Sequence, residues 1–169
     1  MVLRRLSNIL LAGVLTALSH PAFGQVSQDL GRAPFPTSDQ LMAAAGGDSA
    51  AAAVVSAAVS GFLRSRPQST ITIIAEQIPA EWLPAIPGVE WVRLSDGAAR
   101  THAQQCGTFM FVSSFRRPTP DVAVVTVEQG NKCQSIGRNF HFRLTASGWA
   151  ADDGVVGGVV GGRTDCGCP

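Results

Sequence analysis

The sequence predicts an α+β domain in which one helix, at about residues 48–64, packs on a curved antiparallel sheet of four or five strands. Two observations predict this class. The Ala- and Val-rich segment around Val55, Val59 and Phe62 has apolar residues at helical spacing. From Thr70 onward the spacing changes to the alternation and β-branched runs that are typical of strands. Helices that precede consecutive strands are characteristic of α+β domains.

The helical part begins with a polar, Pro- and Gly-bearing segment at residues 25–47, which we expect to be flexible apart from a short helix at 38–45. Asp48 or Ser49 is suited to cap the longer helix that follows. Arg64 and Arg66 complement the negative end of the helix dipole, and Pro67 prevents continuation.

The strand part contains five segments of strand-like pattern. They are residues 70–74, 89–94, 108–115, 122–128 and 138–145. The connection at 78–88 is punctuated by proline, and we expect its Trp82, Leu83 and Ile86 to pack on the core.

The segments at 108–115 and 122–128 flank a Pro-Thr-Pro corner and predict an antiparallel hairpin. Folding the chain between Thr119 and Pro120 makes Phe115 face Val124 and Phe111 face Glu128. The same register brings Cys106 opposite Cys133, so turn and cysteines indicate one hairpin independently. Both faces of this hairpin are apolar: Phe111, Phe115 and Val124 on one side, and Met110, Val112, Val125 and Val127 on the other. Helix and loops therefore cover both faces, or one face lines a pocket or a subunit contact.

One long helix followed by a meander of strands, from about Asp48 to Trp149, resembles the element order of cystatin-like and nuclear-transport-factor-like domains. That resemblance implies a curved sheet wrapped around a helix. Sandwich and partial-barrel arrangements are the alternatives, since these residues contain no family-defining motif.

Residues 1–24 have the three parts of a signal peptide. Arg4 and Arg5 are followed by the apolar run Ile9–Leu18, which is too short to span a bilayer. Ala22 and Gly24 then offer small residues before a cleavage site, with Gln25 as the expected mature N-terminus. We therefore expect an exported protein, periplasmic or extracellular, without a membrane anchor after cleavage.

The composition of the predicted mature chain argues against binding to nucleic acid. Removal of Arg4 and Arg5 leaves 11 basic and 12 acidic residues. This near-neutral balance is not that of a nucleic-acid-binding domain. The sequence indicates no cofactor, metal site or catalytic motif, and no ligand or partner is identified by it.

All four cysteines lie in the predicted mature chain, and an even number in an exported protein indicates disulfides. Cys106 with Cys133 is the pairing that the hairpin predicts, and this bond would stabilise the fold by about 3 to 4 kcal/mol. Cys166 and Cys168 lie in a Gly-rich tail at residues 152–169. They either tie the tail to the domain, pair with each other in an easily reduced bond, or capture a metal.

The basic residues of the strand region form the remaining candidate site. Arg116 and Arg117 lie at the hairpin turn, and His141 and Arg143 share one face of the last strand, near Arg138. They are either solvated surface residues or contacts for a small anionic ligand or an acidic partner. The sequence thus favours a non-catalytic binding or structural module at residues 48–151. One alternative is a thiol-active or metal-capturing protein, and the other is an enzyme with an apolar sheet pocket.

Overall fold

The computed structural model describes residues 35–152, 158–162 and 167–168. The helices are α1 (Ser38–Ala45), α2 (Asp48–Ser65), α3 (Asp96–Gln104) and the 3₁₀ turn η2 (Ala80–Trp82). The strands are β1 (Thr70–Ile74), β2 (Glu90–Leu94), β3 (Phe109–Thr119), β4 (Val122–Gly130), β5 (Gln134–Thr145), β6 (Gly148–Ala151) and β7 (Gly158–Gly162). The predicted signal peptide at 1–24 lies outside the described residues.

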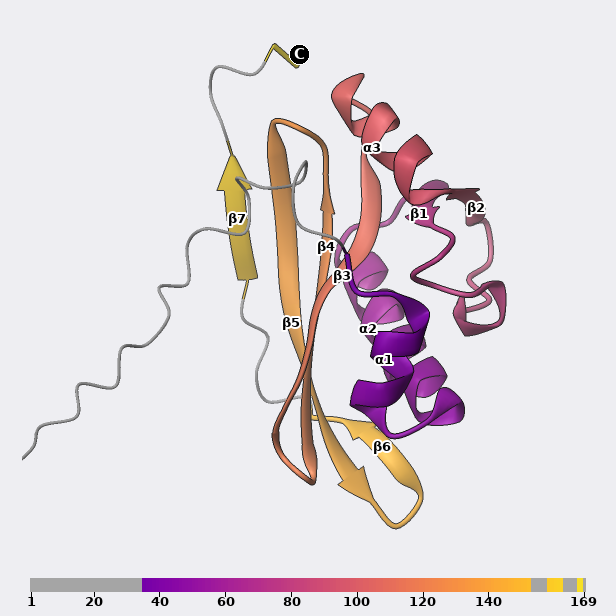
Figure 1. The fold of residues 1–169 in the computed structure, drawn as a ribbon, viewed down its shortest axis with the longest axis vertical. Helices are drawn as coiled ribbons and strands as arrows, with labels where there is room; N and C mark the ends of the chain where they lie inside the picture. Colours follow the sequence, from indigo (N-terminus) through magenta and orange to yellow (C-terminus); the bar gives the residue numbers. More distant parts are fainter. Residues whose placement is uncertain (1–34, 153–157, 163–166, 169) are drawn as a thin grey trace, which may run out of the picture.

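The α-helices pack against a curled mixed sheet, which confirms the α+β class (Figure 1). The strand order is β2-β1-β3-β4-β5-β6, and β7 pairs with the half of β5 that β6 leaves open. The sheet therefore has more strands than the four or five predicted. The antiparallel prediction is wrong for β1, which runs parallel to both β2 and β3. Parallel neighbours require a crossover connection. The loop with η2 supplies one between β1 and β2, and α3 lies between β2 and β3 in the chain.

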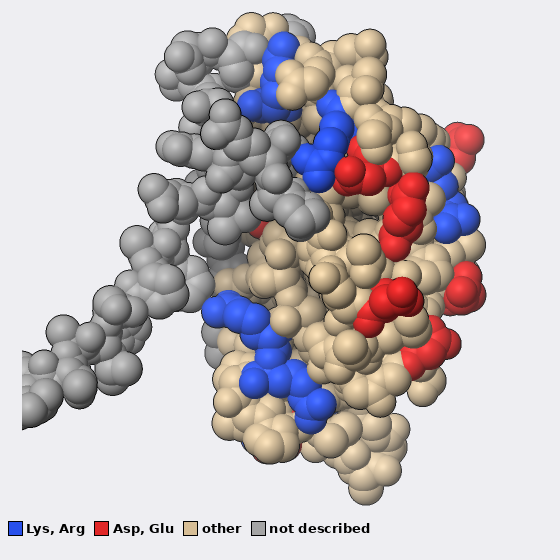
Figure 2. Space-filling model, in the orientation of Figure 1, with Lys and Arg blue, Asp and Glu red and all other residues tan. Residues whose placement is uncertain are grey.

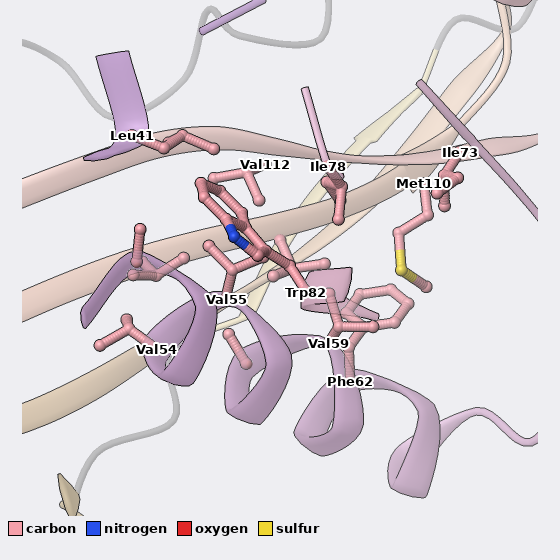
Figure 3. Close-up of a cluster of buried hydrophobic side chains, with 14 of the residues drawn as sticks. Leu41, Val54, Val55, Val59, Phe62, Ile73, Ile78, Trp82, Met110 and Val112 are labelled. Atoms are coloured by element: carbon pink, nitrogen blue, oxygen red, sulfur yellow. The ribbon is translucent and has the colours of Figure 1, made fainter. Parts of the chain in front are cut away.

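Helix α2 covers one face of the sheet and forms the main core with it (Figure 3). Val55, Val59 and Phe62 are fully buried, as their helical spacing predicts. Trp82 closes this core from the η2 segment, and its indole Nε1 donates to Asp48 Oδ1 at 3.0 Å. Asp48 thus binds Trp82, whereas Gly47 is the N-cap residue of α2.

A smaller core lies on the opposite face of the sheet, at the end where β3 begins. Ala99 and Ala103 of α3 pack there with Phe109 and Phe111, and Phe35 lies 4.7 Å from Phe111 between ring centroids. The apolar residues of this end of the hairpin are therefore covered on both faces, by α2 on one side and by α3 with Phe35 on the other.

The β3–β4 hairpin follows the predicted register only in its first half. Phe111 pairs with Glu128, as predicted, but a bulge at Ser113 shifts the pairing by one residue. Phe115 therefore pairs with Val125, not Val124. The bulge also turns Phe115 to the α2 face, so the prediction that it shares a face with Phe111 is wrong.

Strand β1 pairs with β3 at one pair of residues, and the side chain of Gln77 adds hydrogen bonds to β3 beyond that pair. The backbone pairing consists of Ile73 with Met110. Beyond it, the amide of Gln77 accepts from Val112 N at 2.7 Å and donates to Val112 O at 2.8 Å, as a strand residue would. The same amide nitrogen donates to Pro36 O at 3.0 Å.

No helix within the described ranges is by itself long and apolar enough to cross a membrane. The pair α1 and α2 passes this test together by length and composition, with a bend of 103° between the two helices.

Candidate functional site

Three cysteine sulfurs meet at the C-terminal end of α3. Cys106 follows α3, Cys133 precedes β5, and Cys168 comes from the end of the chain. Their Sγ atoms all lie within 4.8 Å of one another. The hairpin therefore does bring Cys106 and Cys133 together, as the sequence predicts.

The bonding within this cluster differs from the prediction. Cys106 is bonded to Cys168, with the Cα atoms 5.5 Å apart, so the predicted Cys106–Cys133 pairing is wrong. Cys133 is also in a disulfide, and Cys166 lies outside the described residues. The difference arises because the chain end reaches the same point as the hairpin, which no local register can reveal.

Cys106 occupies a backbone position that normally favours glycine. It follows the C-cap residue of α3 with φ at 66°. Its N–H donates to Ala103 O at 3.0 Å, and Gly107 N donates to His102 O at 2.9 Å. This is the Schellman arrangement, in which the left-handed residue is usually Gly because a Cβ disfavours that conformation. The motif fixes the direction in which the Cys106 side chain leaves the helix end.

Asn131 holds the second cysteine against the same helix end. This side chain is 5% exposed, and its Nδ2 donates to Cys106 O at 3.2 Å. Its Oδ1 accepts from the backbone nitrogens of Cys133 at 2.8 Å and Gln134 at 3.1 Å. The sequence analysis missed Asn131. Its place between a strand and a cysteine was the available signal, since Asn caps tight turns through such contacts.

The location of Cys106 disfavours thiol catalysis. A catalytic cysteine needs a stabilised thiolate, which helix N-termini and nearby cations provide. Cys106 lies instead at the C-terminal end of α3, where the helix dipole disfavours a negative charge. The geometry therefore supports a structural role, in which the disulfide ties the chain end to the domain across a separation of 62 residues.

The predicted basic residues are divided between the two faces of the sheet. Arg116 and His141 both pair with Val124, and Arg143 pairs with Val122 on the same face. Arg117 lies on the α2 side, where its guanidinium carbon is 5.3 Å from the centroid of the Trp149 ring. Figure 2 shows a band of Lys and Arg side chains across the lower part of this view, with Asp and Glu side chains towards the side that carries β1 and β2.

Two carboxylates offset the charge of Arg143. Its guanidinium lies 3.9 Å from Asp121 and 3.6 Å from Asp152, in exposed ion pairs. The Thr119 hydroxyl, which donates to Asp121 Oδ1 at 2.7 Å, is the largest cause of a lowered pKa at Asp121. A backbone hydrogen bond and the charge of Arg143 lower this pKa further, while desolvation opposes them.

A row of hydrogen-bonded polar side chains crosses three strands beside Arg116 and His141. Ser114 Oγ lies 2.8 Å from Thr126 Oγ1, and Thr126 Oγ1 donates to Asn139 Oδ1 at 2.7 Å. Because Thr126 has a single hydroxyl proton, Ser114 is the donor in the first bond. The row leaves the Asn139 amide nitrogen as a donor on this face. Sequence analysis missed the row because the bulge at Ser113 decides which residues of β3 join it.

A separate small hollow of about 210 Å³ lies at the end of β1. Its lining includes Phe35, Thr37, Ile74, Glu76 and Asp96. The Glu76 carboxylate already accepts from Asp96 N at 3.1 Å. The hollow contains none of the predicted site residues and is below the size of a typical pocket for a drug-sized ligand.

Comparison with known proteins found no matching family, no similar curated protein and no similar solved structure.

Proposed function

We propose that this protein is an exported, disulfide-stabilised domain that acts as a non-catalytic binding module. The observation that carries the disulfide-stabilised domain is the Cys106–Cys168 bond, which closes a separation of 62 residues. The charged start, short apolar run and small residues before Gln25 support export through a cleaved signal peptide.

The polar face around Arg116 and His141 is the proposed binding surface. Both residues pair with Val124, and the Asn139 amide adds a hydrogen-bond donor two residues away along β5. Cationic and amide donors on one face suit a ligand that carries an anionic group, either a small anion or an acidic segment of a partner. Arg116 and His141 flank the same residue of β4, Val124, so we place the centre of the binding surface there, with Arg143 at its edge in ion pairs with Asp121 and Asp152.

The second candidate is a thiol-active or metal-capturing protein. The observation in its favour is the approach of three sulfurs within 4.8 Å, a separation that suits thiolate ligands of one soft metal ion after reduction. The position of Cys106 at a helix C-terminus and its disulfide favour the structural role over this one.

An apolar sheet pocket, the basis of the enzyme alternative, receives no support from the α2 face. Met110, Val112, Val125 and Val127 are all fully buried and belong to the core that α2 packs on. These residues fill space between helix and sheet.

Export is tested by expressing the full chain in a bacterial host and sequencing the N-terminus of the product outside the cytoplasm. We expect a start at Gln25 or a few residues before it. A product that retains residues 1–24 would contradict the proposal. Peptide mapping of that product without reduction should recover Cys106 linked to Cys168, and a Cys106–Cys133 peptide would show that the disulfide assignment is wrong.

Binding is tested by amide NMR titration with inorganic phosphate and, separately, with a short poly-aspartate peptide. We expect shifts centred on Arg116 and His141, and at least fivefold weaker binding for Arg116→Gln or His141→Gln. Arg117→Gln is the matched control, because the adjacent Arg117 lies on the α2 side over Trp149. Equal losses in the Arg116 and Arg117 variants, or no shifts with either probe, would refute this surface.

A further inference from the structure

Strand β2 is an edge strand, and the backbone groups on its outer side have no partner among the described residues. Its inner side pairs with β1: Glu90 N donates to Ser69 O, and Leu94 O accepts from Ala75 N, both at 2.8 Å. In a parallel ladder alternate residues bond to the same neighbour. Glu90, Val92 and Leu94 thus face β1, while the N–H and C=O groups of Trp91 and Arg93 face away from it. Within the described part of the chain, β2 has no strand on that side (Figure 1).

β2 is short and carries the charges of Glu90 and Arg93, but it has no proline, lysine or bulge along its edge. Edges are usually blocked by proline, by lysine or by a bulge. The sequence of β2 is Glu-Trp-Val-Arg-Leu, and its pairing with β1 is continuous over all five residues. The edge is therefore uninterrupted and has a donor and an acceptor at both Trp91 and Arg93.

These outer groups are self-complementary in one antiparallel register. With Val92 opposite Val92 of a second copy, Trp91 of each chain pairs with Arg93 of the other. Both are hydrogen-bonded pairs, so all four outer N–H and C=O groups of each β2 are satisfied. A register centred on Trp91 would instead need Val89, whose N–H already donates to Ile86 O at 3.2 Å.

The side chains agree with the same register. Directly opposed residues lie on one face of the sheet, so the exposed Arg93 of each copy meets the half-buried Trp91 of the other. A guanidinium over an indole ring is a favourable cation–π contact, and symmetry produces it twice. Val92 meets its own copy, and Glu90 meets Leu94, so no like charges are opposed.

We propose that β2 is a homodimer interface, in which two copies pair edge to edge about a twofold axis through Val92 and form one continuous sheet. The proposal goes beyond the binding function assigned above, because β2 and the Arg116 face are at different strands of the sheet.

Cross-linking tests the register directly on the oxidised mature protein. Val92 would be a non-hydrogen-bonded pair on the axis, with Cα atoms about 4.5 Å apart, a distance that permits a disulfide. We expect Val92→Cys to form a covalent dimer in a glutathione buffer at least tenfold faster than Glu90→Cys or Leu94→Cys alone. A mixture of the last two variants should cross-link, because positions 90 and 94 are opposed. Equal rates for all three single variants would overturn the proposal.

Sedimentation equilibrium tests it without added cysteines. Arg93→Pro removes an outer N–H and leaves the β1 ladder, which Val92 and Leu94 maintain, so we expect loss of the dimer. Arg93→Ala is the matched control: it keeps the N–H and removes the guanidinium, which donates to Ala75 O at 3.2 Å within the subunit. Because that bond competes with the contact to Trp91 of the second copy, dimerisation should weaken by no more than about two- to fivefold. Circular dichroism shows whether each variant is folded. If Arg93→Pro is unfolded, the cross-linking result decides the proposal. A wild-type protein that stays monomeric up to about 0.5 mM, close to a millimolar Kd, would overturn the proposal. So would a monomeric protein whose β2 edge binds an added extended peptide.

Discussion

Replacement of Gln77 by methionine should destabilise the domain strongly. Gln77 is 1% exposed and satisfies both backbone groups of Val112, itself fully buried. Methionine has a similar length and no hydrogen-bonding amide. Each buried backbone group left without a partner costs about 1 to 3 kcal/mol, so the two at Val112 should cost roughly 4 kcal/mol together. That is a large share of the 5 to 15 kcal/mol typical of a domain.

Urea unfolding of the oxidised protein measures this cost. With a slope of about 2 kcal/mol/M, the midpoint should fall by roughly 2 M. Gln68→Met is the control. The amide of Gln68 exchanges two hydrogen bonds with the amide of Gln129. Because this pair is half-buried, water can replace the hydrogen bonds that Gln129 loses in the variant. We expect a loss below about 1 kcal/mol there. Equal losses in the two variants would refute the role assigned to Gln77.

A glutamate at position 77 should make stability depend on pH. The ionised carboxylate accepts from Val112 N but cannot donate to Val112 O or Pro36 O, whereas the protonated form has one O–H and can donate to one of these two carbonyls. Burial and these carbonyls therefore raise the folded-state pKa of Gln77→Glu above its unfolded value. The folded state then binds more protons, so the deficit relative to wild type should shrink as pH falls through that raised pKa. A deficit that is constant between pH 4 and pH 8 in urea unfolding would contradict this.

Two further predictions concern α2 and the hairpin turn. Gly61→Ala places a Cβ 2.6 Å from the Phe140 ring, so the gain in helix propensity should be exceeded by overpacking, with a net loss of about 1 kcal/mol. The double variant with Phe140→Leu should show a favourable coupling in unfolding experiments, and strict additivity would argue against the contact. Thr119→Ala should raise the pKa of Asp121 towards its ordinary value, and by more than Arg143→Ala does, because the Thr119 hydroxyl is the larger cause. The contribution of Asp121 to stability is present above its unfolded-state pKa and is lost as pH falls through its lowered folded-state pKa. NMR titration of the carboxyl carbon measures the folded-state pKa. An unchanged pKa in Thr119→Ala would refute the assignment.

The hairpin shows where sequence patterns succeed and where they stop. The turn residues predict the antiparallel pairing, and Phe111 opposite Glu128 confirms its register near the start of β3. The bulge at Ser113 then changes which residues share a face. Neither alternation nor turn composition encodes a single extra residue in a long apolar strand, and the polar row from Ser114 to Asn139 was missed for that reason.

Helix α3 was missed for a different reason. Ser95, Asp96 and Gly97 have the composition of a turn, and the segment after them has few apolar residues. The available signals were Ser95, whose hydroxyl accepts from Ala98 N at 3.3 Å, and the spacing of Ala99 and Ala103. Without this helix the parallel placement of β1, β2 and β3 could not be predicted, because parallel strands depend on the crossovers between them.

The β1–β2 unit is the part of the sheet with the weakest attachment, and this links stability to the proposed dimer. Among the described residues, β1 pairs with β3 through Ile73 and Met110 alone, supplemented by the Gln77 amide, whereas β3, β4 and β5 share long ladders. Gln77→Met should therefore loosen β2 before it affects the Arg116 face. If this reasoning holds, the variant loses dimer in sedimentation while it still binds phosphate at Arg116 and His141. Loss of both together would mean that the sheet responds as one unit and that β2 has no separate stability.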